Sequence, residues 1–323
     1  MDPRLNGPQF LLCLLLIPGA FATGGAARAT AEEWVRTECP PVTASLCDRK
    51  TLFTWRCQKM EDSPQSADAK GADDKEEAEE EEEEDVICTD RPNFTESPFT
   101  VGRGRVQFEA GFTRVTDRSE SAHHQSDSYP ELLLRTGVIA EWMELRVGLN
   151  YARATNGDTD GTSTARGFND TYVGIKIALT EQDGWLPHTA ILPQATLPTG
   201  SETMTEKIVK PGVNFLYTWD LNDDIAFCGS TQGNRAQNED AVTYIEVAQS
   251  FSLECSLTDD FAWFGEWFAF FPTSDVGVDP QHYFDTGVMY LVNNSFQLDA
   301  RVGFGLNDAA DDTFWGVGAS CKY

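Results

Sequence analysis

The chain has 323 residues and a formal net charge of −28 at pH 7, with a pI near 4.3. So acidic a chain is poorly suited to nucleic acid, because phosphate recognition requires a basic face. Mean hydropathy is −0.36, and after the first thirty positions no apolar run reaches the roughly 18 residues of a membrane helix, which excludes a helical membrane protein.

The first 22 residues have the pattern of a secretory signal peptide. Arg4 supplies a weak basic start, and residues 10–17 form a short apolar core that Pro18 interrupts. Residues 20–22 read Ala-Phe-Ala, which fits a cleavage site, and residues 27–29 offer a second candidate. The core is too short to span a membrane as an anchor. Export from the cytoplasm is therefore predicted.

Residues 23–60 form a small cysteine-bearing segment, and residues 61–87 an acidic low-complexity linker. The four clustered cysteines favour two disulfides over a metal site, because the protein is exported and neither a CxxC pair nor a nearby histidine is present. Their connectivity stays open. The candidates are Cys39, Cys47, Cys57 and Cys88. The run Glu79–Asp85 cannot bury a core, and a solvated spacer is the expected role.

Residues 88–323 are assigned to the barrel, and from Val101 onward apolar and polar positions alternate, which predicts β-strands with one apolar face. Twelve strands are expected, each about as long as a tilted membrane strand requires. They lie near 103–116, 129–140, 142–154, 168–180, 188–199, 211–220, 224–233, 241–255, 260–271, 281–292, 294–305 and 313–323. The last one is the clearest, because Trp315, Val317, Ala319, Cys321 and Tyr323 alternate with polar or small residues.

The predicted connections alternate between long and short. Polar stretches at 117–128, 155–167 and 200–210 are long, whereas the links at 141–142, 221–223, 256–259 and 293 are tight. The link at 180–187 is an exception, at about eight residues. This alternation is typical of an outer-membrane barrel with short periplasmic turns and longer external loops. The fold class predicted is thus all-β, an antiparallel transmembrane barrel in outer-membrane lipid. Tyr323 would lie at the periplasmic interface, where barrel-assembly machinery meets it, and Cys321 would be a lipid-facing thiol.

Charged residues of both signs occupy the positions opposite the apolar faces. In lipid an Arg or Lys would cost roughly 2–4 kcal/mol at the midplane, so these side chains are expected to line the lumen and pair there. They are Arg103, Arg105, Glu109, Glu131, Arg135, Glu144, Arg146, Lys176, Glu246, Glu254, Glu266, Asp285, Asp299 and Arg301. The near balance of signs favours a narrow or plugged barrel. Either the charges are scaffold only, or a subset lines a path for a solute or ligand.

The residues just before the first strand suggest a partial plug. Arg91 precedes Pro92, which favours an extended chain, and Asp90, Arg91 and Glu96 could pair with charges of the lumen. We expect residues 88–100 to enter or cross the periplasmic mouth.

Several short motifs resemble a known family. Residues 89–98 read TDRPNFTESP, residues 100–112 TVGRGRVQFEAGF, residues 168–176 FNDTYVGIK and residues 192–200 LPQATLPTG. This pattern resembles the family called putative MetA-pathway of phenol degradation, over about residues 88–323. The resemblance implies an outer-membrane barrel that takes up hydrophobic or aromatic compounds. It brings no catalytic residues, cofactor or metal, and it does not cover the acidic linker or the cysteine-bearing head.

Other functions fit less well. A barrel hydrolase would need a serine or acid within reach of His123, His124, His188 or His282, and no such spacing is recognisable. A soluble secreted β-sandwich that binds a ligand would expose too many aromatic side chains on single faces. The sequence thus predicts a non-enzymatic transporter or channel for small solutes, with a purely structural barrel as the nearest alternative.

Overall fold

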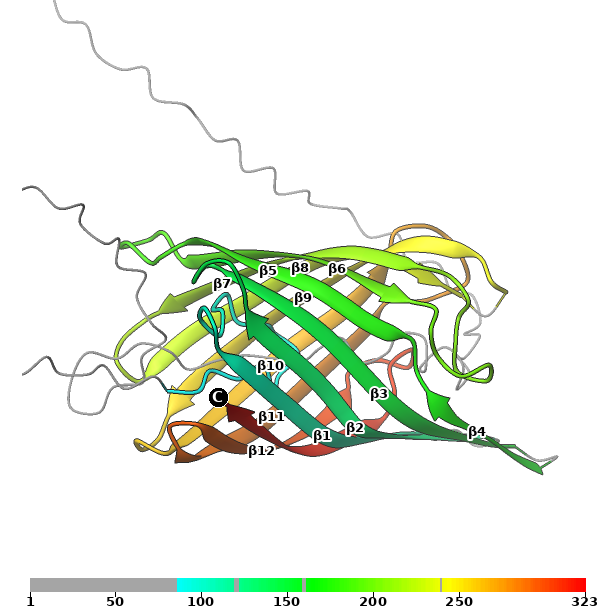
Figure 1. The fold of residues 1–323 in the computed structure, drawn as a ribbon. Coiled ribbons are helices and arrows are strands. Elements are labelled where there is room, and N and C mark those ends of the chain that lie inside the picture. Colours follow the sequence, from blue (N-terminus) through cyan, green and yellow to red (C-terminus); the bar gives the residue numbers. More distant parts are fainter. Residues whose placement is uncertain (1–85, 119–121, 159–160, 239) are drawn as a thin grey trace, which may run out of the picture.

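The computed structural model describes residues 86–118, 122–158, 161–238 and 240–323. Within these ranges all regular structure is β-strand (Figure 1). The strands are β1 (Val106–Arg118), β2 (His123–Gly137), β3 (Met143–Asp158), β4 (Gly161–Phe168), β5 (Thr171–Thr180), β6 (His188–Leu197), β7 (Lys210–Asp220), β8 (Ile225–Gln237), β9 (Thr243–Ser256), β10 (Phe261–Pro272), β11 (Gln281–Asn293), β12 (Phe296–Gly305) and β13 (Thr313–Lys322). None of the described residues forms a helix long and apolar enough to cross a membrane.

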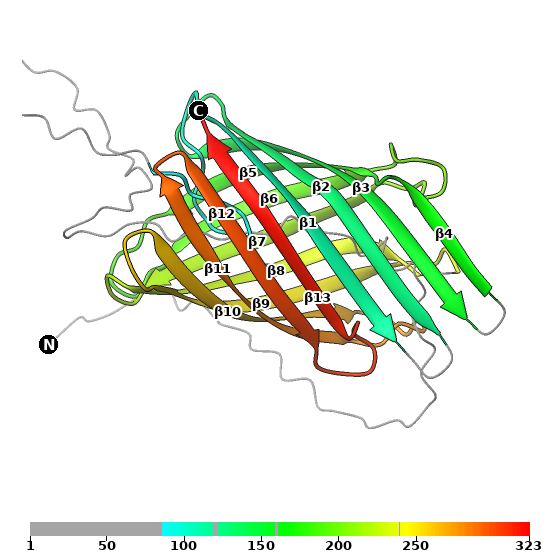
Figure 2. The same ribbon diagram turned by 90° about the horizontal axis from the view of Figure 1, so that it is seen from below.

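The strands form one closed antiparallel barrel. Consecutive strands pair with each other, except that β4 and β5 both pair with β3, and the wall closes where β13 pairs with β1 (Figure 2). β4 pairs with the C-terminal half of β3 and β5 with the N-terminal half, so the two occupy one position in the wall. The described wall therefore has twelve positions, as the sequence predicted. The seam is tight, since Val106 and Tyr323 exchange backbone hydrogen bonds of 2.9 and 2.8 Å.

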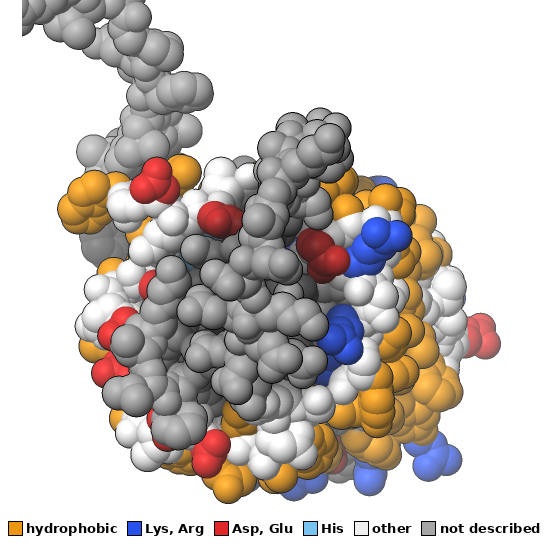
Figure 3. Space-filling model, turned by 60° about the vertical axis from the view of Figure 1, so that its left-hand side comes forward, with side chains coloured by type: hydrophobic (Ala, Val, Ile, Leu, Met, Phe, Trp, Pro, Cys, Tyr) orange, Lys and Arg blue, Asp and Glu red, His pale blue; other side chains and the backbone are white. Residues whose placement is uncertain are grey.

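The alternation in the sequence places apolar side chains outside. In β13 the side chains of Trp315 and Val317 are 44% and 47% exposed, whereas Ser320 on the other face is 1% exposed. Ring contacts run across the outer surface from Tyr217 on β7 to His282 on β11. Hydrophobic side chains cover the visible flank of the barrel in Figure 3. Cys321 lies on this outer face as a free thiol.

The two ends of the barrel differ. At the turn end, strands are joined by residues 138–142, 181–187, 221–224, 257–260 and 294–295; the other end, here called the loop end, holds 198–209, 238–242, 273–280 and 306–312. Two predicted loops are wrong. Most of 117–128 and 155–167 is strand, because β1–β2 and β3–β4 continue as long polar hairpins in which Arg118 pairs with His123 and Asp158 with Gly161. Backbone pairing continues there without an apolar face.

Candidate functional site

A segment of fifteen residues, 86–100, lies inside the barrel and is here called the inner segment (cyan in Figure 1). It enters at the turn end, where Ile87 N donates to Asn294 O at 2.6 Å and Lys322 Nζ to Val86 O at 2.9 Å. It leaves at the same end, where Thr100 Oγ1 donates to Glu141 O. Residues 86–98 are all buried. The inner segment is thus a loop pushed into the lumen from one mouth.

Asp90 anchors the first half of the inner segment to three cations of the wall. Its carboxylate lies 3.0 Å from Arg135 Nη1 and 3.2 Å from Lys176 Nζ, and it accepts a hydrogen bond from Arg146. These three cations come from β2, β3 and β5, which stand side by side. All four side chains are fully buried. The side chains of Arg135, Arg146 and Lys176 all point inward from neighbouring strands, at similar heights along the barrel. A single carboxylate can therefore contact all three.

Three further carboxylates complete this buried network. Glu96 of the inner segment accepts from Arg146 Nη1 at 2.7 Å, and Glu144 accepts from Arg135 Nε at 2.8 Å. Glu109 accepts from the backbone N–H of Asp90 at 2.8 Å. Buried charges are tolerated only when they are paired and hydrogen-bonded. The ion pairs between the inner segment and the wall meet this requirement.

Arg91 points toward the seam strands, next to the part of the wall that Asp90 contacts. Its Nη1 lies 2.8 Å from Glu131 Oε2, its Nε 3.4 Å from Asp299 Oδ2, and Nη2 donates to Val317 O at 3.3 Å. The guanidinium lies close against β1 and β13. A Cβ at Gly111 or Gly318 would stand 2.3 Å from it. Glycine at these two positions makes this close approach possible.

The tip of the inner segment, residues 93–95, is held by carboxylates and aromatic rings. Phe94 N and Thr95 N donate to the two oxygens of Glu266 at 2.5 and 2.6 Å, and Asn93 Nδ2 donates to Glu254 Oε1 at 2.9 Å. The Phe94 ring stacks on Phe268 with centroids 4.5 Å apart, inside a buried cluster that includes Phe270, Tyr283 and Phe314.

Backbone carbonyls of the inner segment also find partners in the wall. Gln107 Nε2 and Arg135 Nη1 donate to Cys88 O at 2.8 and 3.0 Å, and Lys176 Nζ to Phe99 O at 3.2 Å. Arg301 Nη1 donates to Pro92 O at 3.0 Å. The lumen thus pairs with side chains, backbone N–H groups and backbone carbonyls of the inner segment, and is complementary to that peptide.

Most of the predicted lumen residues face inward, and two do not. Glu246, Glu254, Glu266, Asp285 and Asp299 are buried on the inner face, and Arg301 is half-buried there. Arg103 and Arg105 are exposed at the turn end outside the wall, because β1 begins at Val106 and a turn with positive φ at Gly102 and Gly104 precedes it. The inward-outward parity of a strand does not extend into such a turn.

Other predicted positions have mixed outcomes. His123 and His124 belong to β2 rather than to a loop, and His124 is 7% exposed with Nδ1 2.8 Å from Asn156 Oδ1. The signal peptide, the cysteine-bearing segment and the linker to residue 85 lie outside the described residues, as do Cys39, Cys47 and Cys57. Cys88 is buried with Sγ 3.9 Å from Ser97 Oγ, and the disulfides stay a prediction.

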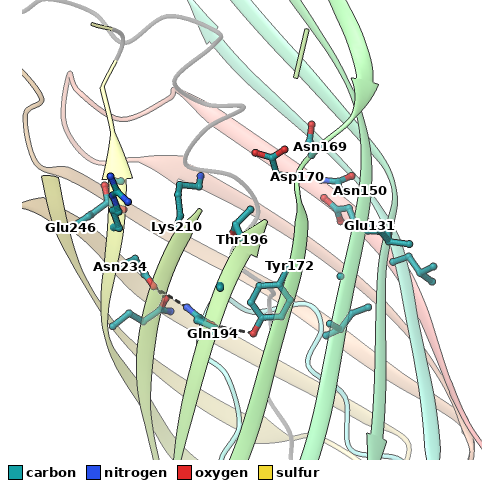
Figure 4. Close-up of a pocket in the computed structure, with 18 of the residues that line it drawn as sticks. Glu131, Asn150, Asn169, Asp170, Tyr172, Gln194, Thr196, Lys210, Asn234 and Glu246 are labelled. Atoms are coloured by element: carbon teal, nitrogen blue, oxygen red, sulfur yellow. Dashed lines mark hydrogen bonds between the residues drawn. The ribbon is translucent and has the colours of Figure 1, made fainter. Parts of the chain in front are cut away.

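A cavity opens on the loop-end side of the inner segment (Figure 4). Its empty volume is about 1250 Å³ including the open mouth, and Arg91, Glu109 and Glu131 border it next to the segment. Its walls carry many uncharged polar side chains: Asn150, Tyr172, Gln194, Thr196, Gln232, Asn234 and Gln237. These neutral side chains are not among the predicted lumen residues, which were all charged. The same inward parity nevertheless identifies Gln194, Gln232 and Asn234 as inward-facing. Among the described residues, no group of three or more His, Cys, Asp or Glu side chains could hold a metal ion.

Comparison with solved structures identifies the fold. The COG4313 outer membrane channel from Pseudomonas putida F1 aligns with a TM-score of 0.57 at 10% identity, covering 70% of this chain and 97% of that one. The NanC porin aligns with 0.44 at 11% identity, covering 68% and 100%. The KdgM porin in complex with disordered oligogalacturonate aligns with 0.41 at 10% identity, covering 68% and 99%. No curated protein sequence matches the chain.

The fold places the chain in the outer membrane, with the apolar outer face in lipid and the inner segment in the lumen. The sequence family described as putative MetA-pathway of phenol degradation matches residues 89–323, which is nearly the whole inner segment and barrel. The chain belongs to this family of outer-membrane β-barrel proteins.

Proposed function

We propose that this barrel is a channel for small solutes and that the inner segment is a partial plug in its path. The observation that carries the proposal is the burial of residues 86–98 in the lumen, with an open cavity directly beyond them. A barrel that served only as a scaffold could fill its lumen with wall side chains alone. Here the filling is a loop that contacts the wall through the hydrogen bonds, ion pairs and ring contacts of residues 86–100, and its release would not require the strands to separate.

Orientation follows from loop length. Short turns face the periplasm in outer-membrane barrels, so the plug enters from the periplasmic side and the cavity faces outward. A solute from outside would reach the cavity first and the plug second. We propose no catalytic activity for the chain, since the structural neighbour with the same fold is a channel.

Removing the plug tests the proposal. Planar-bilayer recordings of the wild type, of a deletion of residues 88–98 and of a control deletion of residues 66–76 in the acidic linker would be compared. The 88–98 deletion should raise the single-channel conductance or the open probability, and the linker deletion should not. Heat-modifiable migration on gels would verify that each barrel is folded. An unchanged conductance in a folded 88–98 deletion would contradict the plug.

We also propose that Tyr323 is recognised by the barrel-assembly machinery. Its backbone completes the seam with Val106, while its side chain is 73% exposed and contacts the Phe108 ring at a centroid distance of 6.5 Å. An exposed aromatic ring at the free end of the closing strand is available to a partner before and after the seam forms. Replacing Tyr323 with Ala should lower the yield of folded barrel in cells but leave refolding in detergent unchanged.

A further inference from the structure

The cavity beyond the inner segment carries a row of carboxamides on neighbouring strands. Gln194 on β6, Gly212 on β7 and Asn234 on β8 are direct register partners on the inner face. Gln194 Nε2 donates to Asn234 Oδ1 at 3.0 Å, and Asn234 Nδ2 donates to Gln232 Oε1 at 3.2 Å. We call Gln194, Asn234 and Gln232 the amide row; Figure 4 shows Gln194 and Asn234 joined across the cavity wall.

A glycine makes the amide row possible. A Cβ at Gly212 would stand 1.9 Å from Asn234 Oδ1, so any side chain there would prevent Asn234 from reaching over β7 to Gln194. Each carboxamide has two N–H donors and an oxygen with two lone pairs. The hydrogen bond between Gln194 and Asn234 uses one N–H of Gln194, and the bond to Gln232 uses one N–H of Asn234. Donors and acceptors therefore remain for a ligand in the cavity.

Tyr172 extends the amide row with an aromatic ring. Its hydroxyl donates to Gln194 Oε1 at 3.1 Å. The wall beneath it is bare, because a Cβ at Gly148 would stand 3.1 Å from Tyr172 Cβ and one at Gly174 would stand 2.8 Å from its hydroxyl. The ring thus lies along the wall beside the carboxamides. An aromatic face next to uncharged hydrogen-bonding groups is suited to a ligand with an apolar face and many hydroxyls.

Several of the charged groups that line the cavity already contact other groups of the protein. Lys210 Nζ lies 2.8 Å from Glu206 Oε1, and Arg235 Nη1 donates to Val209 O at 3.4 Å. Asp170 accepts the backbone N–H groups of Gly200 and Glu206 at 2.9 and 3.1 Å. An ionic ligand would compete with these partners, whereas a purely apolar one would leave the remaining N–H donors and oxygen lone pairs of the amide row without partners, which costs about 1–3 kcal/mol per buried group.

We propose that the cavity is a binding site for a neutral, hydroxyl-rich solute of the size of a mono- or disaccharide, held by the amide row and stacked on Tyr172. This inference rests on the proposed channel and names its solute class. It departs from the hydrophobic or aromatic compounds that the family resemblance implies, because the amide row offers more hydrogen bonds than a largely apolar compound can use.

Binding can be measured without conduction. Equilibrium dialysis of radiolabelled maltose against the full-length protein in detergent micelles should show saturable binding, competed by sucrose and not by gluconate or toluene. The double variant Gln194→Leu with Asn234→Leu should weaken maltose binding at least about tenfold, the loss of one to two neutral hydrogen bonds. The matched control is Gln249→Leu, an amide on the outer face bonded to Thr231, which should bind as the wild type does.

A second pair of variants separates stacking from folding defects. Tyr172→Phe keeps the ring and should retain binding within about threefold, whereas Tyr172→Leu should lose it. Stronger competition by toluene or gluconate than by sucrose, or equal binding by the Gln194/Asn234 double variant, would overturn the inference. If the 88–98 deletion conducts but maltose neither binds nor blocks, the solute class is wrong and the channel stands; if maltose binds but no variant conducts, the channel is wrong.

Discussion

Replacing Asp90 with Asn should release the inner segment from the lumen. The substitution keeps the shape of the side chain, so it leaves no cavity and removes only the charge. Asp90 is the carboxylate that meets Arg135, Arg146 and Lys176 together, and every group in this set is fully buried. After the change, Glu144 and Glu109 still face Arg135 and Glu96 still faces Arg146, but Lys176 loses the carboxylate that forms its ion pair described above.

The expected magnitude follows from that loss. Removing one partner of a buried ion pair costs about 3–5 kcal/mol, because the remaining charge is buried without compensation. The lower value applies here, since other carboxylates remain close to two of the cations. A loss of about 3 kcal/mol in docking free energy raises the population of the undocked segment by roughly two orders of magnitude.

The buried thiol of Cys88 reports on this equilibrium. Under reducing conditions, maleimide labelling at Cys88, resolved by peptide mass spectrometry, should accelerate about 100-fold in Asp90→Asn when docking is fast relative to labelling. The control is Asp223→Asn, an exposed carboxylate in the turn 221–224. The reasoning is refuted if Cys88 of Asp90→Asn reacts within about twofold of the wild type while the barrel remains folded.

Three further predictions address the tip, the seam and the outer face. Phe94→Ala removes the stack on Phe268 and should cost about 3–5 kcal/mol of docking, seen as faster Cys88 labelling, with barrel melting unchanged if the tip is not part of the wall. Gly318→Val places atoms where the Arg91 guanidinium lies and should raise the open probability of the channel; equal gating in Gly318→Val and the wild type would contradict that packing. Val317→Arg puts a charge on the lipid face and should lower barrel stability by about 2–4 kcal/mol in urea unfolding from lipid vesicles, whereas Lys322→Gln on the inner face should not reproduce this lipid-dependent loss.

The wall could be predicted from the sequence because the apolar and polar alternation of each strand indicates which of its side chains face outward. In β13, the alternation from Trp315 to Tyr323 identifies both the strand and the face that meets lipid, without knowledge of any neighbour. The same parity predicts Glu109, Arg135 and Arg146 as inward. It fails at Arg103 and Arg105, because parity defines a direction only while the backbone stays extended, and positive φ at Gly102 and Gly104 ends that condition.

Other features depend on contacts that no single strand encodes. The polar hairpins around His124 and Thr155 lack an apolar face, so nothing in their sequence separates them from loops. Phe268 and Phe270 face the lumen because Phe94 from another part of the chain covers them, and the local pattern of β10 gives no sign of it. The amide row forms only when β6, β7 and β8 pair with Gly212 in register between Gln194 and Asn234. Neutral side chains also cost less in lipid than charged ones, so their position in the sequence indicates the lumen less clearly.

The contacts of Arg91 link the inner segment to the closure of the barrel. Its partners Asp299 and Val317 belong to β12 and β13, at the seam where the wall closes on β1. The inner segment lies just before β1 in the sequence, so its docking brings Arg91 to the strands that form the seam. Closure and internal docking are thereby coupled steps of one folding reaction. If the inner segment stayed outside the lumen, β12 and β13 would meet β1 without the Arg91 guanidinium that pairs with Asp299.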